Sequence, residues 1–298
     1  MSFTLEWVMQ HAIGITIKEF LKTQSISKAA LTDIKFKGGK ILVNGKEENV
    51  RYSLKNGDRL VVLFPPELPS VGLIPERLPL DIIFEDEYIL IVQKEYGMNT
   101  IPSREHPTGS LANALVSYYQ EHGIKATTHI VTRLDRDTSG LVLIAKHRHI
   151  HHLLSEQQKA GDVKRKYIAF AEGEISPLSD TINDPIGRCS DSIIKREVRE
   201  DGQTAITHYR VVAQHVPFSK LELSLETGRT HQIRVHLAYK GHPLLGDDLY
   251  GGKRNEMDRQ ALHCFFLKFT HPVTKQTMTF AIDLPEDMKK LEQEMKKS

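Results

Sequence analysis

Five prolines fall within one segment of sixteen residues, F-P-P-E-L-P-S-V-G-L-I-P-E-R-L-P at 64–79, and they constrain the fold more than any other feature. Proline has a fixed φ angle and no amide hydrogen to donate, so this segment cannot lie inside a helix or a sheet. It predicts an extended linker at 67–79 between a small domain at 1–66 and a large domain at 80–298. A chain of 298 residues is long enough for two such domains.

The small domain shows alternating signals for short helices and strands. Thr16 and Ser27 each precede a segment with helical spacing, so both are predicted to cap helices. Asn44-Gly45 follows the apolar run 41–43 and predicts a two-residue hairpin turn. These signals indicate a small α/β module.

The same module is basic. Residues 16–60 contain ten lysines and arginines against five acidic residues, whereas the whole chain has a net charge of only +2. A basic module beside a nearly neutral domain is typical of an attachment that binds a polyanion. A solvated, lysine-rich surface is the alternative that charge alone leaves open.

The large domain carries many strand signals, several of them with apolar residues at every second position. The expected strands are 88–92, 130–133, 141–145, 167–171, 206–213, 221–225, 262–269 and 278–282. Helices are expected at 149–160, at 230–239 and after Pro285. Strands that follow one another without regular helical crossovers favour an α+β fold, with a mixed, mainly antiparallel sheet and flanking helices.

Other features exclude several classes of protein. Cys189 and Cys264 lie far apart, which favours a reducing compartment over a disulfide framework or a thiolate zinc site. Because no apolar run is long enough for a membrane span and the N-terminus lacks a signal-peptide pattern, we expect a cytoplasmic protein with no membrane partner. The phosphate-loop, dinucleotide-binding and serine-hydrolase motifs are absent.

Two groups of histidines are dense enough to raise the question of a metal site. His231, His236 and His242 are spaced by five and six residues. Two metal ligands on one helix face need a spacing of three or four, so no metal site is expected here. The histidine-rich stretch 147–152 is expected to be the solvated surface of a helix.

The stretch T-R-L-D-R-D-T-S-G-L, residues 132–141, places two aspartates in a polar loop before an apolar strand. Strands on both sides would hold the loop rigidly, which suits a reactive carboxylate. In an extended loop, Asp135 and Asp137 would share a side and the two arginines beside them would face away. The loop alone does not choose between the aspartates, and a polar turn without chemistry is the alternative.

Two further polar clusters accompany this loop. T-G-R-T-H-Q-I-R-V-H at 227–236 gathers cationic side chains at the start of a helix that Thr230 would cap, and a helix start suits an anion. V-K-R-K-Y-I-A at 163–169 places three basic residues before Tyr167. Basic side chains suit a phosphate backbone and the ring suits stacking on a base, although a core tyrosine beside surface lysines gives the same pattern.

Together these clusters resemble one family, the RluA/RluD-type RNA pseudouridine synthases. R-L-D-R-D-T-S-G-L at 133–141 matches the family's R-L-D-x-x-T-S-G motif, and K-R-K-Y-I-A at 164–169 matches the segment of its active-site tyrosine. T-G-R-T-H-Q-I-R-V-H-L at 227–237 and G-H-P-L-L-G-D at 241–247 match its C-terminal motif. Residues 13–64 resemble an S4 RNA-binding domain.

Two positions depart from the family pattern. Residues 86–98 resemble its first motif, but they contain Lys94-Glu95-Tyr96-Gly97 where the family usually has K-P-x-G. Thr132 stands where the family usually has a histidine before R-L-D.

The resemblance implies an enzyme that isomerises uridine to pseudouridine in RNA, with large-subunit ribosomal RNA as the expected substrate. It implies a monomer that needs no cofactor and no metal. The family's catalytic aspartate maps to Asp135, its stacking tyrosine to Tyr167, and the arginine that pairs with the aspartate to Arg234. Contacts to RNA are expected from Ser27, Lys28, Lys35, Lys37, Lys164, Arg165, Arg229 and His231.

Two other functions stay open at this point. Asp135 and Asp137 could supply the two carboxylates, about 5–10 Å apart, of a nucleoside or glycoside hydrolase. The chain could also be a non-catalytic RNA-binding factor of ribosome assembly. Several long motifs in the family's order favour the synthase over both.

Overall fold

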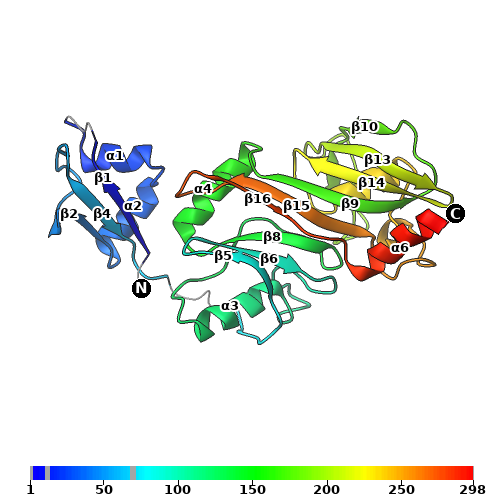
Figure 1. Cartoon of the computed structure of the whole chain (residues 1–298), viewed down its shortest axis with the longest axis horizontal. Helices are drawn as coiled ribbons and strands as arrows, with labels where there is room; N and C mark the ends of the chain where they lie inside the picture. Colours follow the sequence, from blue (N-terminus) through cyan, green and yellow to red (C-terminus); the bar gives the residue numbers. More distant parts are fainter. Residues whose placement is uncertain (1–2, 11–13, 68–71, 298) are drawn as a thin grey trace.

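The computed structural model describes residues 3–10, 14–67 and 72–297. The N-terminal domain consists of a four-stranded antiparallel sheet and two helices (Figure 1), which enclose an apolar core around Ile34 and Leu60. Its sheet order is β1-β4-β2-β3. Its elements are β1 (Thr4–Val8), α1 (Ile17–Thr23), α2 (Lys28–Phe36), β2 (Lys40–Val43), β3 (Lys46–Glu47) and β4 (Arg59–Leu63).

The predicted caps and hairpin turn of this domain are confirmed. The side chains of Thr16 and Ser27 each accept a hydrogen bond from the backbone amide three residues further on. Asn44 and Gly45 both have positive φ angles and join β2 to β3. A two-residue turn of this kind matches the twist of the strands that it joins.

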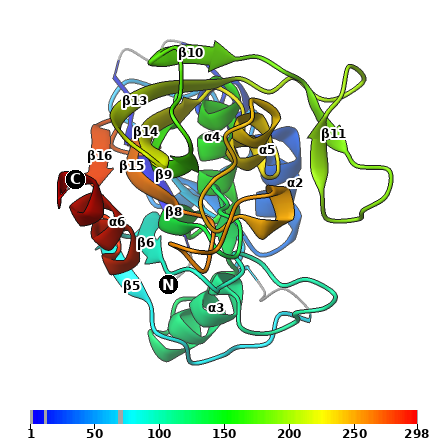
Figure 2. The ribbon, with the colours of Figure 1, turned by 90° about the vertical axis from the view of Figure 1, so that its right-hand side faces the viewer.

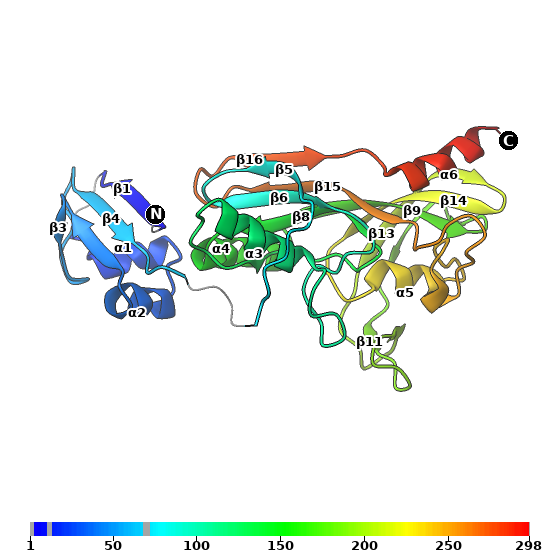
Figure 3. The ribbon, with the colours of Figure 1, turned by 90° about the horizontal axis from the view of Figure 1, so that it is seen from below.

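The large domain is built on one ten-stranded sheet with order β10-β13-β14-β9-β15-β8-β6-β5, on which β16 pairs with β15 and β7 with β8 (Figures 1 and 3). Of the strand pairs that the structure describes, only β8–β15 is parallel, so the predicted α+β fold is confirmed. The strands are β5 (Asp81–Glu85), β6 (Ile89–Lys94), β7 (His129–Ile130), β8 (Ser139–Ala145), β9 (Lys164–Glu172), β10 (Ser179–Ile182), β13 (Thr207–His215), β14 (Phe218–Leu225), β15 (Leu262–Thr270) and β16 (Thr277–Ala281).

Helices cover both faces of this sheet, and a separate hairpin stands out from its body (Figure 2). The hairpin consists of β11 (Ile186–Arg188) and β12 (Arg196–Val198). The helices are α3 (Leu111–Glu121), α4 (Arg148–Lys159), α5 (Gln232–Tyr239), the short 3-10 helix η1 (Asp248–Tyr250) and α6 (Glu286–Lys297). No helix in the described part of the chain is long and apolar enough to cross a membrane.

Alternate residues of the central strands pack on opposite faces of the sheet, as the pleat requires. On β6, Leu90 packs in the cluster that includes α3 and α5, whereas Ile91 packs in the cluster that includes α4. On β9, Tyr167 belongs to the α3–α5 face and Ile168 to the face that α6 covers. Tyr167 therefore lies on the same side of the sheet as the polar cluster at the start of α5.

The parallel pair β8–β15 fixes where β8 begins. Gly140 pairs with Cys264, and its φ is +124°, a value that residues with a Cβ rarely adopt. A Cβ at position 140 would overlap the main chain of Cys264. The loop that precedes β8, which carries Asp135, is therefore anchored at a close contact between two strands.

The N-terminal domain contacts the large domain through stacked rings. Phe3 stacks on His147 with ring centroids 4.1 Å apart, and Phe64 stacks on His149 at 5.4 Å. Burial lowers the pKa of both histidines to about 4, so both rings are neutral at pH 7. The expectation that residues 147–152 form a solvated surface is therefore wrong for these two, because the other domain covers them.

The strand expected at 130–133 is shorter than predicted. The strand pairing of β7 ends at Ile130, and the side chain of Thr132 accepts a hydrogen bond from the Leu143 amide at 2.9 Å. The amides of Val131 and Thr132 still donate to the Leu143 carbonyl, and the chain leaves the sheet after Thr132, before it reaches Asp135. The threonine that departs from the family pattern is buried and ends this strand.

Candidate active site

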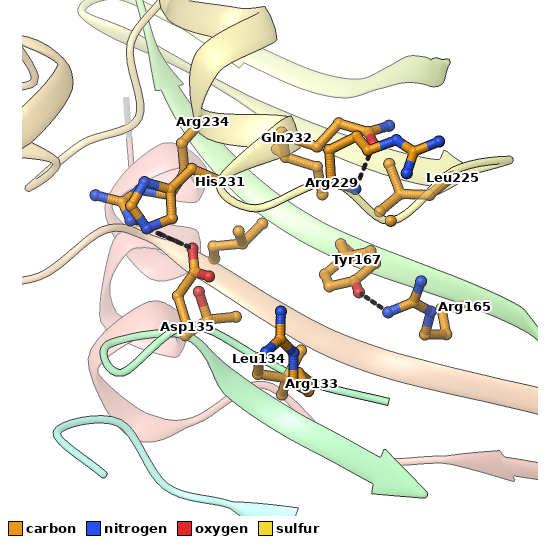
Figure 4. A pocket seen from close by; sticks show the side chains of 14 residues that line it. Arg133, Leu134, Asp135, Arg165, Tyr167, Leu225, Arg229, His231, Gln232 and Arg234 are labelled. Atoms are coloured by element: carbon orange, nitrogen blue, oxygen red, sulfur yellow. Dashed lines mark hydrogen bonds and ion pairs between the residues drawn. The ribbon is translucent and has the colours of Figure 1, made fainter. Parts of the chain in front are cut away.

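One pocket in the large domain collects the residues that the motifs predicted (Figure 4). Its lining includes all three predicted catalytic residues and three of the predicted RNA contacts. These residues are Asp135, Tyr167, Arg234, Arg165, Arg229 and His231. Four stretches of chain far apart in sequence supply its whole lining: the loop before β8, the start of β9, the segment from the end of β14 into α5, and the start of β15.

The other predicted RNA contacts lie elsewhere. Lys164 is an exposed residue at the start of β9 and does not line the pocket. The N-terminal domain holds the remaining four: Ser27, Lys28, Lys35 and Lys37. All four lie on or beside α2, so the structure brings them together in one place, away from the pocket.

Arg234 joins two aspartates. Its Nη1 donates to Asp135 Oδ2 at 3.2 Å, and its Nε and Nη2 donate to the two carboxylate oxygens of Asp247, each at 2.7 Å. The Asp247 side chain is fully buried. Burial alone would lower the pKa of Arg234, but the two carboxylates outweigh it and raise that pKa well above its ordinary value. Arg234 is thus a permanent cation, aimed at Asp135 by a two-bond pair on its other edge.

The turn before α5 sets the position of Arg234. His231 precedes the helix in the left-handed conformation, with φ 58°. The side chain of Gln232 accepts hydrogen bonds from the Arg229 amide at 2.9 Å and from the Thr227 hydroxyl at 2.8 Å. The prediction that Thr230 caps the helix is wrong, because the N-cap position is His231, whose side chain makes no capping bond, and the Gln232 side-chain oxygen accepts from the Arg229 amide instead.

The loop of Asp135 is a turn and not an extended segment. The Thr138 amide donates to the Asp135 carbonyl at 3.1 Å. The expectation that both neighbouring arginines face away is therefore wrong, because Arg133 lines the same pocket as Asp135. Asp137 is directed elsewhere and pairs with Arg136 at 3.1 Å.

Two buried side chains tie this loop to the segment that follows β6. The Lys94 ammonium donates to the carbonyls of Glu95, Met98 and Arg136 at 2.7, 2.8 and 3.0 Å. The Thr100 hydroxyl donates to the Leu134 carbonyl at 2.6 Å. Lys94 is 1% exposed. Burial lowers its pKa to about 7, although nearby aspartates oppose the shift.

Arg259 holds the other side of the loop. Its Nε and Nη2 donate to the Asp287 carboxylate of α6 at 2.7 and 3.0 Å. Its Nη1 donates to the Asp137 carbonyl at 3.1 Å. The guanidinium lies 4.6 Å from the centroid of the Tyr96 ring. The C-terminal helix therefore reaches the aspartate loop through one buried arginine.

A second tyrosine orders His231. The Tyr250 hydroxyl accepts from the Arg196 amide at 2.9 Å and is hydrogen-bonded to His231 Nδ1 at 2.8 Å. If the Tyr250 hydroxyl donates this hydrogen bond to Nδ1, the neutral imidazole carries its proton on Nε2. Nε2 is 3.9 Å from Asp135 Oδ2. Burial lowers the pKa of His231, and Asp135 partly opposes that shift. The Arg234 guanidinium lies 5.0 Å from the centroid of the Tyr250 ring.

Tyr167 is buried in the wall of the pocket. Its hydroxyl accepts a hydrogen bond from Arg165 Nη1 at 3.3 Å. Burial raises the pKa of Tyr167 far above its ordinary value. The phenol is therefore neutral at physiological pH, and it offers a flat ring and a hydroxyl to whatever enters.

The C-terminal histidines have separate partners. His236 is hydrogen-bonded to the Thr207 hydroxyl and to the Asp184 carbonyl, at 2.9 and 2.8 Å. His242 is hydrogen-bonded to the Glu172 carbonyl at 2.9 Å. Among the described residues, no group of three histidine, cysteine or acidic side chains is arranged to hold a metal ion.

The pocket opens into a larger groove in which cations outnumber anions. Seven arginines line this groove against four acidic residues. The arginines are Arg133, Arg136, Arg165, Arg229, Arg234, Arg254 and Arg259, and the acids are Glu105, Asp135, Asp137 and Asp248. A basic groove that leads to a small pocket suits a nucleic acid that inserts one base.

Several residues that build the site were not assigned roles from the sequence. Asp247 ends the G-H-P-L-L-G-D stretch, but no local pattern distinguishes a buried carboxylate from a surface one. Tyr250 lies only three residues further on and carries no motif signal. Lys94 ends an apolar strand, where a lysine ordinarily reaches solvent.

Comparisons with known proteins identify the family of this chain. Residues 88–239 match the family model described as RNA pseudouridylate synthase. The uncharacterised RNA pseudouridine synthase YjbO of Bacillus subtilis is 52% identical over 93% of this chain and 98% of its own length. The ribosomal large subunit pseudouridine synthase D of Neisseria meningitidis serogroup A is 36% identical over 88% of this chain and 73% of its own length.

A solved structure gives the same fold. Human RNA pseudouridylate synthase domain containing 4 superposes with a TM-score of 0.59 at 22% identity, covering 72% of this chain and 93% of that one. The fold is thus that of the pseudouridine synthases, a class of RNA-modifying isomerases. The chain belongs to the RluA/RluD-type RNA pseudouridine synthase family. Membership decides against a hydrolase and against a non-catalytic RNA-binding factor.

Proposed function

We propose that this enzyme isomerises uridines of large-subunit ribosomal RNA and that Asp135 is its catalytic residue. The support for the RNA is the relatives named for the large ribosomal subunit, such as the Neisseria protein. The support for the residue is its geometry, because Asp135 lies in the pocket and contacts Arg234. Asp137, by contrast, does not line the pocket.

The reaction moves one bond and leaves the composition of the RNA unchanged. The target uridine leaves its stack and enters the pocket, because its reacting atoms are unreachable in a structured RNA. The bond from the sugar to N1 of the base breaks, the base turns, and a bond from the sugar to C5 forms. The hydrogen at C5 then leaves as a proton to solvent, and N1, which has lost its bond to the sugar, takes up a proton.

Each side chain of the pocket has a separate proposed role in this reaction. Asp135 acts as a nucleophile or as a base, and Arg234 holds its carboxylate in position through a hydrogen bond from Nη1. The Tyr167 ring supports the base while it turns, and its neutral hydroxyl is available to carry a proton. Arg165, Arg229 and the groove arginines bind the phosphates on either side of the target.

The test is release of tritium from large-subunit ribosomal RNA that is transcribed in vitro with uridine tritiated at C5. Wild type is expected to release tritium, and Asp135→Asn is expected to lose at least about 10³-fold in rate. Asp137→Asn is the matched control and is expected to keep most of the activity. Full activity of Asp135→Asn, or loss in Asp137→Asn alone, would sink the assignment.

We further propose that the N-terminal domain is an S4-type anchor for RNA. Lys28, Lys35 and Lys37 lie on or directly after α2, whose start is capped by Ser27. Replacing the three lysines with glutamine should weaken RNA binding and lower the slope of log affinity against log salt by about 2–3, with kcat unchanged. The control is Lys289→Gln on α6. An unchanged salt slope in the triple variant would contradict this role.

A further inference from the structure

The turn that carries Tyr96 is fixed relative to the catalytic loop. Lys94 donates to two carbonyls of that turn and to the Arg136 carbonyl. Arg259 contacts the same loop, through the Asp137 carbonyl, and its guanidinium lies behind the Tyr96 ring. Two independent clamps therefore hold the ring at a preset place beside the loop of Asp135.

Tyr96 is nevertheless 55% exposed. One side of the ring lies on the Arg259 guanidinium, 4.6 Å from the ring centroid. Arg259 itself is buried, and all three of its nitrogens already donate to Asp287 or to main-chain carbonyls. The arginine does not need the ring as a partner, and folding does not need an aromatic residue at so exposed a position.

The place of the ring points to a ligand. Arg259 lines the same groove as Asp135, and Tyr96, which is not itself part of the lining, lies against Arg259 and so just outside the groove. Because the groove is rich in arginine, it suits the phosphates of an RNA strand that enters the pocket. Every RNA base has a flat face that stacks on an aromatic ring without regard to sequence.

We infer that Tyr96 is a stacking platform for a base that flanks the flipped uridine. This inference rests on the proposed function, and it adds a nucleotide site that the catalytic pocket does not contain. The base left unstacked when its neighbour enters the pocket would stack again on the ring. Part of the free-energy cost of flipping is thereby offset by an interaction that forms only when the RNA is docked.

The experiment measures tritium release and RNA affinity in four proteins: wild type, Tyr96→Phe, Tyr96→Ala and Tyr239→Ala. Loss of one base–aromatic stack is expected to raise KM of Tyr96→Ala by roughly 10- to 100-fold, with a smaller change in kcat at saturating RNA. Tyr96→Phe keeps the ring and is expected to behave like wild type. Tyr239 is a matched control, because it is 58% exposed and also lies against a cation, Lys240, but Lys240 does not line the groove, whereas Arg259 does.

A KM of Tyr96→Ala equal to that of wild type overturns the inference, and so does an equal loss in Tyr96→Phe. Affinity for the same transcript is also measured in the Asp135→Asn background, which needs no turnover. If wild type releases no tritium, the proposed function fails. In that case weaker binding caused by Tyr96→Ala still supports the platform, and unchanged binding overturns it.

A photocrosslink locates the base. With p-benzoylphenylalanine at position 96, primer extension on the irradiated transcript is expected to stop within about two nucleotides of the modified uridine, given the chain spacing of adjacent bases. A crosslink confined to distant nucleotides overturns the inference, even if KM changes.

Discussion

Two arginines of this enzyme have nearly the same surroundings on opposite sides of one loop. Arg234 and Arg259 each use Nε and Nη2 to bind an aspartate, Asp247 and Asp287 respectively. Each guanidinium also lies near a tyrosine ring, at 5.0 and 4.6 Å. They differ in the group that Nη1 meets, which is the Asp135 carboxylate for Arg234 and the main-chain carbonyl at 137 for Arg259.

This difference separates two uses of the same motif. A guanidinium on a carboxylate fixes the direction of a side chain in the pocket, whereas a guanidinium on a carbonyl holds the shape of the main chain. The two aspartates of D-R-D look equivalent in the sequence, and the residues packed around them make them unequal.

The largest contrast is expected between Arg234→Gln and Arg259→Gln. Arg234→Gln removes the partner of Asp135 and is expected to lower kcat by about 10²–10³-fold. Arg259→Gln leaves that pair intact and shifts the loop, so a loss of about tenfold is expected. Single-turnover tritium release at saturating RNA measures both. Equal losses of kcat in the two variants would contradict the distinction between the two arginines.

Substitutions of the two aspartates that pair with these arginines, Asp247 and Asp287, should differ more in the free energy of unfolding than in the reaction rate. Asp247→Asn leaves a buried guanidinium short of a charge and is expected to cost about 3–5 kcal/mol in the free energy of unfolding. Arg259 is buried as well, but the Asp287 side chain is 30% exposed, so water screens this pair and can replace part of it, and Asp287→Asn is expected to cost about 1 kcal/mol. Denaturant titration of the two variants gives the values, and a larger cost for Asp287→Asn would reverse the comparison.

Lys94 adds a cation whose charge depends on pH. Its pKa is lowered to about 7 by burial, so between pH 7 and the ordinary lysine value the unfolded chain binds one more proton than the folded one. The free energy of unfolding of wild type should therefore rise with pH across that window, relative to Lys94→Met, by at most about 1.4 kcal/mol per pH unit. Urea titrations at several pH values measure the slope. If the free energy of unfolding of wild type instead fell with pH relative to that of Lys94→Met, the fold would stabilise the Lys94 ammonium and not destabilise it.

The smallest contrast concerns the two tyrosines. Tyr250→Phe removes the hydroxyl that joins His231 to the Arg196 amide, and a loss of about 1 kcal/mol in transition-state stabilisation is expected. Measured as kcat/KM, this is roughly fivefold. Tyr96→Phe should change neither kcat nor KM. An equal loss of kcat/KM in both variants would contradict the idea that the Tyr250 hydroxyl acts by ordering His231, because the Tyr96 hydroxyl has no such role.

The sequence was sufficient for those parts of the site that depend on short motifs. Strand alternation located most of the sheet, and the ordered motifs placed Asp135, Tyr167 and Arg234 in one pocket, although 99 positions separate the aspartate from its arginine. Helix α3 was missed although Leu111, Leu115 and Tyr119 recur at helical spacing; its polar residues Asn113 and Ser117 are buried, so they do not mark a solvent-exposed face. The cover over His147 and His149 could not be seen either, since it comes from a different domain.

Gly140 closes the motif by which the family was first suspected. No chemistry needs a glycine there; the main chain of Cys264 simply leaves no volume for a side chain. One residue of the motif is therefore required by packing, and another, Asp135, is the one proposed to be catalytic. A protein that kept Gly140 and lost Asp135 would retain the shape of this loop and still resemble a synthase. In a search for active members of the family, the presence of both Asp135 and Arg234 is therefore more informative than the presence of Gly140.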